Sequence, residues 1–192
     1  MITKSNGGVM TAERGKTDCA QMLLSGTASG VMGASSIAMQ TKVPMAMSLD
    51  IGGTSADVSI INSGEPQFGI GELIGEFPIY IPSVSVSSIG EGGGSIAWMD
   101  EQGILKVGPE SAGSTPGPAC YGKGGEKPTI TDALVVLGYL GKSELGYNAV
   151  QIDSSLAHQA ISNLAGHLSL TQQEVAEAIV KIAVSGLSLI HI

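Results

Sequence analysis

The clearest pattern along the chain is an apolar segment that is interrupted by a short polar stretch and then resumes. Hydrophobic residues dominate positions 45–49, small and polar residues fill 50–57, and branched aliphatic residues return at 58–61. Apolar runs on either side of a glycine-containing turn are typical of a β-hairpin. The sequence therefore predicts a strand, a tight turn and a second strand over 45–61.

Other periodic segments surround this hairpin. Residues 18–40 have helical spacing but are rich in glycine, serine and alanine, and a helical glycine costs about 1 kcal/mol relative to alanine. We expect this helix to pack closely against a sheet or to leave room for a ligand. The remaining predicted elements are strands at 77–81 and 84–89, a hairpin at 96–99 and 104–107, a loop at 108–128, a helix capped by Thr131-Asp132 and ending near 138–141, and two amphipathic helices, at 154–168 and from the capping box Thr171–Glu174 onward.

The polar stretch of the first hairpin carries residue types that suit a phosphate group and its cation. Gly52 and Gly53 lack a Cβ atom, so the backbone can turn sharply and its N–H groups can approach an anion. The Thr54 hydroxyl can donate to a phosphate oxygen, and the Asp50 carboxylate can hold a hydrated divalent cation. An ordinary glycine turn is the alternative.

Several other polar residues have both a chemical and a structural interpretation. Asp57 either caps the turn or acts as a general base. Cys120 has no neighbouring base in the sequence, so we expect a packed or merely exposed thiol and not a nucleophile. Asp132 is interpreted as the N-cap or a first-turn residue of its helix. His158 and His167 are expected to be surface residues and not joint ligands of a metal.

Composition and charge narrow the range of partners. The chain has 192 residues and a net charge of −8, without any cluster of lysine or arginine, which argues against nucleic acid. Charged residues make up 14%, a low share for an isolated soluble domain, so we expect part of the surface to be covered by another chain or domain. There is no apolar signal segment and no membrane-spanning run, and Cys19 and Cys120 have no disulfide or metal spacing. A cytoplasmic location is expected.

A series of short motifs occurs in order along the chain. They are Ser5-Asn-Gly-Gly8, Ser25-Gly26 with Gly30, Asp50-Ile-Gly-Gly-Thr-Ser-Ala-Asp57, Ile89-Gly-Glu-Gly-Gly-Gly-Ser-Ile-Ala97, Val107-Gly-Pro-Glu-Ser-Ala-Gly113, Pro116-Gly-Pro-Ala-Cys-Tyr-Gly122 and Thr129-Ile-Thr-Asp-Ala133. Together they resemble the hydantoinase A / 5-oxoprolinase family, which includes the acetone carboxylase β subunit. The resemblance covers roughly residues 5–185.

The resemblance implies an α/β fold, namely one lobe of an actin-, sugar-kinase- and heat-shock-chaperone-like ATPase of the ribonuclease H-like type, with β-hairpins and a C-terminal helical pair. In that fold a helix leads into a strand that turns through an Asp-x-Gly-Gly-Thr hairpin against the phosphates, and residues 18–61 have this order. A further loop of this type belongs to a missing N-terminal lobe. We assign 1–187 to a partial domain and 188–192 to a non-native tail.

The resemblance also implies an ATP- and Mg²⁺-dependent hydrolysis of a cyclic amide such as 5-oxoproline or a hydantoin. Phosphorylation of the carbonyl oxygen breaks the amide delocalisation, and the ring C–N bond is then hydrolysed with the help of a B-type subunit or domain. Asp50 and Asp57 are assigned catalytic roles, and Asp50 is also the metal ligand. The residues assigned to the nucleotide are Gly52, Gly53, Thr54, Gly92, Gly93, Gly94 and Ser95.

Some residues depart from the family pattern. Ser85 stands where many relatives have an acidic residue, Glu91 interrupts the glycine run, and Thr27 and Ser29 replace the usual Pro and Gly. A carboxylate beside phosphates repels them, so Glu91 either joins a metal shell or, as we favour, points away. Two alternative functions stay open: an acetone-carboxylase-type β subunit that activates a ketone with ATP, and an ATP-binding interaction module.

Overall fold

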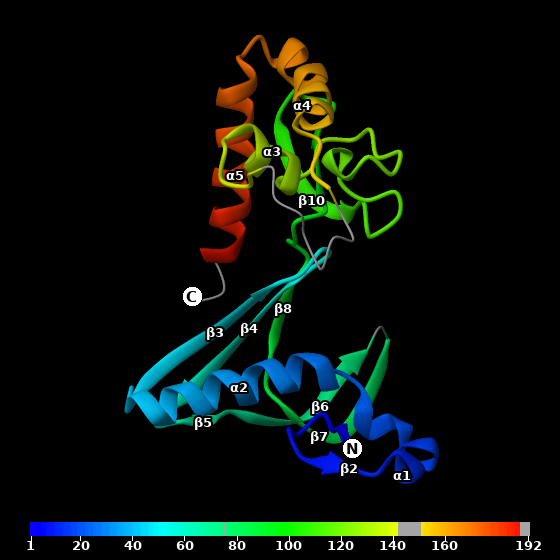
Figure 1. Cartoon of the computed structure of the whole chain (residues 1–192), viewed down its shortest axis with the longest axis vertical. Helices are drawn as coiled ribbons and strands as arrows, with labels where there is room; N and C mark the ends of the chain where they lie inside the picture. The colour runs from blue at the N-terminus through cyan, green and yellow to red at the C-terminus, as the bar shows by residue number, and fades with distance from the viewer. Residues whose placement is uncertain (75, 142–150, 189–192) are drawn as a thin grey trace. The chain divides into compact units, whose positions relative to one another are not determined.

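The computed structural model describes residues 1–74, 76–141 and 151–188 and has a mixed α/β architecture (Figure 1). The chain divides into two compact units. The first comprises Met1–Asp50 and Asp57–Ser88, and the second comprises Ile51–Ala56 and Ile89–Ile192. The mixed architecture confirms the broad fold class that the sequence predicts. No helix in the described ranges is both long and apolar enough to cross a membrane.

The helical part of the first unit differs from the single helix expected at 18–40. A 3₁₀ turn, Cys19–Met22, precedes the helix, and Leu24 adopts a left-handed conformation with φ of 59°. The helix α2 therefore begins only at Ser25 and ends at Thr41. The elements before it are β1 (Ile2–Thr3), β2 (Val9–Met10) and α1 (Ala12–Thr17), with β1 and β2 paired antiparallel.

The predicted hairpin forms the centre of a four-stranded sheet. Its strands are β3 (Met45–Ile51) and β4 (Ala56–Asn62), and β4 also pairs with β5 (Glu65–Pro66) and β8 (Ser87–Ile89). Val58 and Ile61 of β4 are buried, whereas every second residue of β3 is an exposed hydrophobic one. The hairpin prediction is confirmed.

A separate two-stranded ribbon completes the first unit. Its strands are β6 (Phe68–Ile74) and β7 (Phe77–Val84), paired antiparallel with an irregularity between Ile70 and Glu72. The sequence assigned no separate strand to 68–74. It also started a second strand at 84, whereas β7 runs through Val84 and β8 begins only at Ser87. Within the described residues β6 and β7 pair only with each other, and β7 contains Pro78 and Pro82, which are typical of edge strands.

The second unit packs a hairpin against three helices. The hairpin consists of β9 (Ser95–Met99) and β10 (Leu105–Ser111), so its second strand runs further into the predicted loop than expected. A 3₁₀ turn, Ala119–Tyr121, interrupts the same loop. The helices are α3 (Ile130–Val136), α4 (Ser154–Leu168) and α5 (Gln172–Ser188), and their core includes Ala97, Ala133, Ile161, Leu164, Val175 and Ile179.

The starts of α3 and α5 follow local sequence rules. Thr129, and not Thr131, is the N-cap of α3, and Asp132 closes a capping box with it, which confirms Asp132 as a first-turn residue. The predicted capping box before α5 is present: the Glu174 carboxylate accepts from the Thr171 N–H at 2.9 Å. Helix α5 extends to Ser188, the first residue of the expected tail, and 189–192 lie outside the described residues.

Candidate functional site

The turn of the first hairpin presents free backbone donors to solvent. Gly52 N–H donates to the Ser55 carbonyl at 2.8 Å, which closes the turn. Gly53 and Thr54 are exposed, and their N–H groups donate to no acceptor within the described residues. A Cβ atom on Gly53 would meet nothing within 4 Å. Adjacent backbone N–H groups without a partner on an exposed turn can bind an anion.

The glycine run, residues 92–94 of the second unit, fixes this turn through backbone hydrogen bonds. Gly93 N–H donates to the Gly52 carbonyl at 2.9 Å, and Gly94 N–H donates to the Gly53 carbonyl at 2.6 Å. A Cβ atom on Gly92 would lie 2.7 Å from the Gly52 carbonyl oxygen and from backbone atoms of Thr54 and Ser55. The run therefore needs glycine because backbone approaches backbone.

Neighbouring hydroxyls fix the glycine run in turn. The Ser95 hydroxyl accepts from Gly92 N–H at 3.0 Å, and the Thr131 hydroxyl donates to the Gly93 carbonyl at 2.8 Å. The N–H groups of Gly92, Gly93 and Gly94 are thus already engaged within the protein. Their predicted contact with a nucleotide stays a prediction, and the hydrogen bonds give them a role in supporting the turn.

The two predicted catalytic carboxylates share a cavity in the first unit. This cavity of about 260 Å³ lies between α2 and the β3–β4 hairpin and is lined by Thr27, Gly30, Val31, Ala34, Ser48, Leu49, Asp50 and Asp57. Small residues of α2 form one wall, so the helix leaves room beside the carboxylates. This cavity agrees with the expectation that the small residues of the helix leave room for a ligand.

Asp57 is held by two hydroxyl groups that the sequence did not point to. Its Oδ2 accepts from the Thr27 hydroxyl at 3.0 Å, and its Oδ1 accepts from the Ser88 hydroxyl at 2.6 Å. Thr27 and Ser88 lie about 30 residues from Asp57 on either side, a separation at which no local motif links them. Asp50 is exposed, and its carboxylate has no hydrogen-bond partner within the described ranges.

Glu91 leaves the glycine run and lies against helix α5. A Cβ atom added at Gly186 of α5 would lie 2.0 Å from Glu91 Oε1 and 2.3 Å from Oε2, so the carboxylate occupies the space that a side chain at 186 would need. The Oε2 atom is buried and has no hydrogen-bond partner among the described residues. Burial raises the pKa of the Glu91 carboxyl above its ordinary value of 4.5. The contact with α5 agrees with the expectation that Glu91 points away.

Cys120 and Asp132 form a structural pair. Asp132 is fully buried and accepts from the N–H groups of Ala119, Cys120 and Thr129 and from the Thr129 hydroxyl. Burial, followed by the negative charge of Asp132, strongly raises the pKa of the Cys120 thiol. A thiol that stays protonated is a poor nucleophile, so Cys120 is the packed thiol that the sequence favoured.

The histidines also have the expected surface positions. His158 Nδ1 lies 2.7 Å from the Gln172 side-chain oxygen, and His167 Nδ1 lies 2.7 Å from the Asn163 carbonyl oxygen. Both residues are exposed and they have different neighbours. Across the described part of the chain, no three His, Cys, Asp or Glu side chains gather in a way that could hold a metal.

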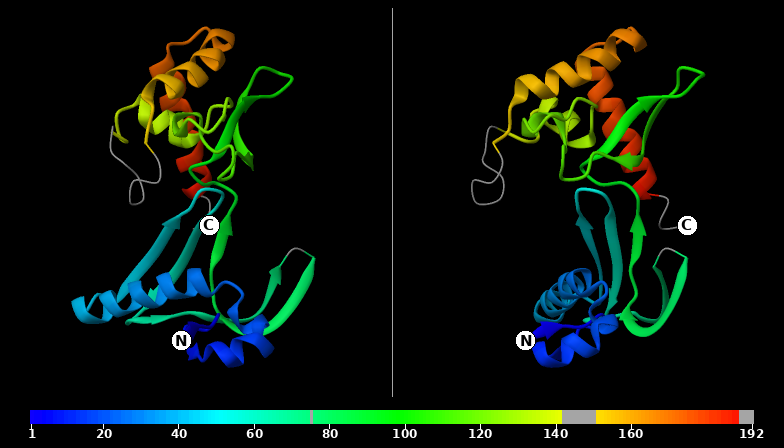
Figure 2. Two further views of the ribbon diagram at one scale, coloured as in Figure 1. Left: turned by 45° about the vertical axis from the view of Figure 1, so that its right-hand side comes forward. Right: turned by 90° about the vertical axis from the view of Figure 1, so that its right-hand side faces the viewer.

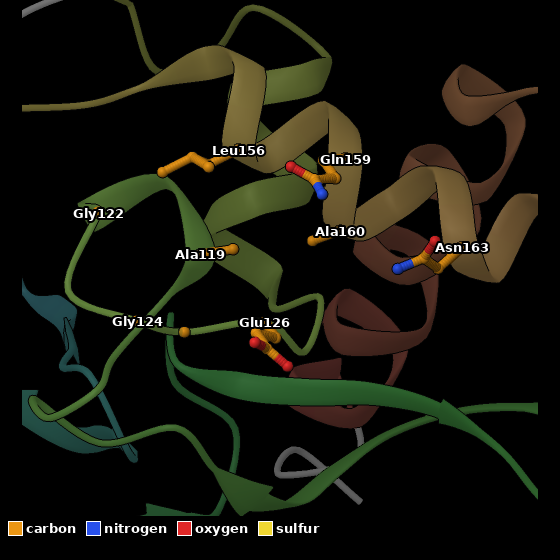
Figure 3. A pocket seen from close by; sticks show the side chains of 9 residues that line it. Ala119, Gly122, Gly124, Glu126, Leu156, Gln159, Ala160 and Asn163 are labelled. Carbon is orange, nitrogen blue, oxygen red and sulfur yellow. The ribbon is translucent and has the colours of Figure 1, made fainter.

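A second cavity, of about 570 Å³, lies in the second unit and contains none of the predicted site residues. Figure 3 shows Gln159, Ala160 and Asn163 of α4 on one side and the loop with Gly124 and Glu126 on the other. The candidate residues therefore lie outside this cavity, in two groups: the hairpin turn, which belongs to the second unit, and the carboxylates Asp50 and Asp57, which belong to the first.

Comparison with known proteins identifies relatives of this chain. The family model described as hydantoinase/oxoprolinase matches residues 1–188. The chain is 35% identical to the caprolactamase subunit alpha of Pseudomonas jessenii over 178 residues, which cover 92% of this chain and 26% of the relative. It is 36% identical to a 5-oxoprolinase of Pestalotiopsis fici over 197 residues, which cover 96% of this chain and 15% of the relative.

A solved structure is also similar. The nucleotide-free structure of an acetone carboxylase, from work on ATP-dependent acetone carboxylation, matches with a TM-score of 0.81 and 30% sequence identity. The match covers 97% of this chain and 26% of that one. The chain thus spans about a quarter or less of the length of these relatives.

Proposed function

Because this chain belongs to the hydantoinase/oxoprolinase family, we propose that it supplies the phosphate-binding hairpin of an ATP-dependent cyclic amide hydrolase of the 5-oxoprolinase or hydantoinase type. The family contains ATP-dependent amide-hydrolysing enzymes and acetone carboxylase subunits, which supports an enzyme of this class. We further propose that the chain forms one lobe of an actin-like ATPase fold, works in the cytoplasm, and acts together with a missing N-terminal lobe and a B-type subunit or domain.

The observation that supports phosphate binding most directly is the pair of exposed N–H groups at Gly53 and Thr54. They have no acceptor within the described residues, and the turn that carries them is fixed by Gly93 and Gly94. A rigid pair of donors can bind an anion without first being ordered, which makes electrostatic stabilisation of a transferring phosphoryl group efficient. Gly52, Gly53 and Thr54 are the proposed phosphate contacts.

Asp50 is the proposed partner of Mg²⁺. It precedes the turn by two residues, and its carboxylate is exposed and unengaged within the described ranges. Mg²⁺ keeps several of its waters and binds through one or two carboxylates together with phosphates. One free carboxylate beside a phosphate-binding turn fits that requirement, and a cluster of protein ligands is not needed. The ion would neutralise charge on the phosphates.

The proposed reaction transfers the γ-phosphoryl group of ATP to the carbonyl oxygen of the cyclic amide. The bond between the γ-phosphorus and the ADP oxygen breaks as the new P–O bond forms. Water then adds to the activated carbon, and the C–N bond breaks as the ring nitrogen takes up a proton and leaves as an amine. A second water hydrolyses the resulting acyl phosphate to a carboxylate and inorganic phosphate. Asp57, oriented by Thr27 and Ser88, is the proposed general base of this site. Gly92, Gly93, Gly94 and Ser95 support the turn and stay proposed neighbours of the nucleotide.

A second candidate function is activation of a ketone for carboxylation, as in an acetone-carboxylase-type β subunit. The structural similarity to acetone carboxylase over nearly the whole chain favours it. Both functions would use the same hairpin and differ in their substrate, so the two are distinguished by testing which substrate supports ATP turnover.

A substrate panel with the complete polypeptide that contains this chain, together with its partner subunits, tests the proposal. We expect release of ADP that depends on 5-oxoproline or a hydantoin and not on acetone. Release with acetone and bicarbonate alone would support the second function. The absence of ADP release with every substrate, from an assembly that binds none of them, would contradict both.

A further inference from the structure

A cavity of about 310 Å³ adjoins the turn of the first hairpin within the second unit. Ser111 lines this cavity, and its hydroxyl lies 3.4 Å from the Gly53 carbonyl oxygen and 3.5 Å from the Thr54 hydroxyl. The volume is near the lower end of the range for small-molecule sites, which runs from roughly 300 to 1,000 Å³. A small ring molecule in this cavity would therefore lie beside the proposed phosphate contacts.

The lining of this cavity combines apolar surface with a few polar groups. Ile96, Ala112 and Pro116 supply apolar surface, and Ser111 and Thr115 carry hydroxyl groups. Sites for small ligands usually have this composition, in which the polar groups fix the orientation of the ligand. A hydroxyl can both donate and accept a hydrogen bond, so the lining suits an uncharged amide group, which has one donor and one acceptor.

Glu126 lies where this cavity meets the larger cavity of about 570 Å³, because it lines both. It belongs to the loop at 112–128, yellow-green in Figure 2, which runs between the β9–β10 hairpin and α4. The loop packs closely on itself at this point, since a Cβ atom on Gly125 would collide with the Gly117 carbonyl oxygen. Within the described residues the Glu126 side chain has no hydrogen bond or ion pair, so its carboxylate is free to accept from a ligand.

The charges at the two cavities do not suit an anion. Lys127 is the one cation among the described residues that line them, and its Nζ is paired with Glu110 Oε1 at 3.0 Å. Lys123 belongs to the same loop but lines neither cavity. Glu126 thus keeps an uncompensated negative charge, which repels a carboxylate and attracts an N–H donor.

We propose that the cavity beside Ser111 binds the cyclic amide substrate and that Glu126 accepts a hydrogen bond from an N–H group of its ring. The same carboxylate makes the site selective for uncharged rings over rings that carry a carboxylate. The substrate class is then an uncharged lactam or a hydantoin, and 5-oxoproline, which is ionised at neutral pH, is disfavoured. This inference rests on the proposed function and deepens it, because it assigns the substrate to a cavity and names the residue that selects it.

The test compares two ligands that share one ring: 5-oxoproline and its uncharged carboxamide, 5-oxoprolinamide. Their Kd values are measured at neutral pH by titration calorimetry, with Mg²⁺ and a non-hydrolysable ATP analogue present. The protein is the complete polypeptide that contains this chain, together with its partner subunits. We expect the wild type to bind the carboxamide about tenfold more tightly, and this preference to shrink as salt is raised from about 50 to about 500 mM.

Glu126→Gln keeps the size of the side chain and removes its charge, so the two Kd values should come to within about twofold of each other. Glu126→Ala makes the same test if Glu126→Gln does not fold. The matched control is Glu101→Gln, because Glu101 is exposed and lines neither cavity. This control should keep the wild-type preference.

Three outcomes would overturn the inference. The wild type could bind 5-oxoproline as tightly as the carboxamide or more tightly, Glu126→Gln could keep the wild-type preference, or neither ligand could bind. ADP release from ATP, measured in parallel, separates these results from the proposed function. ADP release that depends on 5-oxoproline, together with equal Kd values, would keep the proposed function and reject selection by Glu126. A preference that Glu126→Gln abolishes, without ADP release on any substrate, would keep the selection and count against the proposed function.

Discussion

The N–H group of Gly93 donates to the carbonyl oxygen of Gly52 at 2.9 Å, and this bond ties the glycine run to the turn of the first hairpin. The neighbouring bond from Gly94 N–H to the Gly53 carbonyl has a length of 2.6 Å. The backbone of the turn thus has its carbonyl groups engaged on one side, while the N–H groups of Gly53 and Thr54 stay available for an anion. This arrangement links two motifs that lie about 40 residues apart in the sequence.

Replacement of Gly92 by alanine is expected to impair ATP binding. The added Cβ atom would lie 2.7 Å from the backbone of Gly52, Thr54 and Ser55, so the turn must shift. We expect at least a tenfold higher Kd for ATP, equivalent to about 1.4 kcal/mol. The measurement is titration calorimetry with the complete polypeptide.

Gly90→Ala is the matched control for this variant, because a Cβ atom there meets nothing within 4 Å. Its Kd should equal that of the wild type. Equal ATP affinity of Gly92→Ala and Gly90→Ala would show that the packing of the run does not shape the site.

Replacement of Asp57 by asparagine distinguishes a structural role of this residue from a role as general base. Asparagine can still hydrogen-bond with the hydroxyls of Thr27 and Ser88, so we expect a nearly unchanged melting temperature. A general base contributes on the order of 10²–10⁴-fold to the rate, so kcat should fall by about this factor. A variant with normal kcat would leave Asp57 as a structural residue only.

Glu91 is expected to make stability depend on pH. Burial raises the pKa of this carboxyl in the folded state, so the folded state binds the proton more tightly than the unfolded chain does. The stabilising contribution is therefore complete below the unfolded pKa of about 4.5 and is lost as pH rises through the higher folded pKa. Glu91→Gln should remove this loss, so its melting temperature should exceed that of the wild type at pH 8 by more than it does at pH 4.

A melting-temperature difference that is the same at both pH values would contradict this account of Glu91. The matched control is Glu65→Gln, because Glu65 is exposed and its variant should follow the wild type across the range.

The sequence predicts those features that depend on neighbouring residues. The first hairpin, the helix over 154–168 and the Thr171–Glu174 capping box all follow from local patterns, and the structure confirms them. The predicted start of α2 at residue 18 was wrong. Leu24 adopts a left-handed conformation that delays the helix to Ser25, and a leucine gives no local signal for that conformation.

The parts of the site that were missed depend on contacts between distant residues. Ser88 and Thr27 reach Asp57 only because β8 and α2 pack beside the hairpin, and no spacing rule links these three positions. The sequence identified Gly92, Gly93 and Gly94 as a motif but not as the support of the turn. That role follows from distances between backbone atoms, which a linear motif does not contain.

The role of Asp50 is the most direct test of the proposed site. Asp50 is exposed and unengaged within the described residues, so Asp50→Ala should fold and melt like the wild type. We expect this variant of the complete polypeptide to lose Mg²⁺-dependent ATP turnover, because the free carboxylate beside the turn is removed. Glu65→Gln, with another exposed acidic residue on the same sheet changed, should keep full turnover. Undiminished turnover in Asp50→Ala would contradict the assignment of this hairpin to Mg²⁺ and ATP.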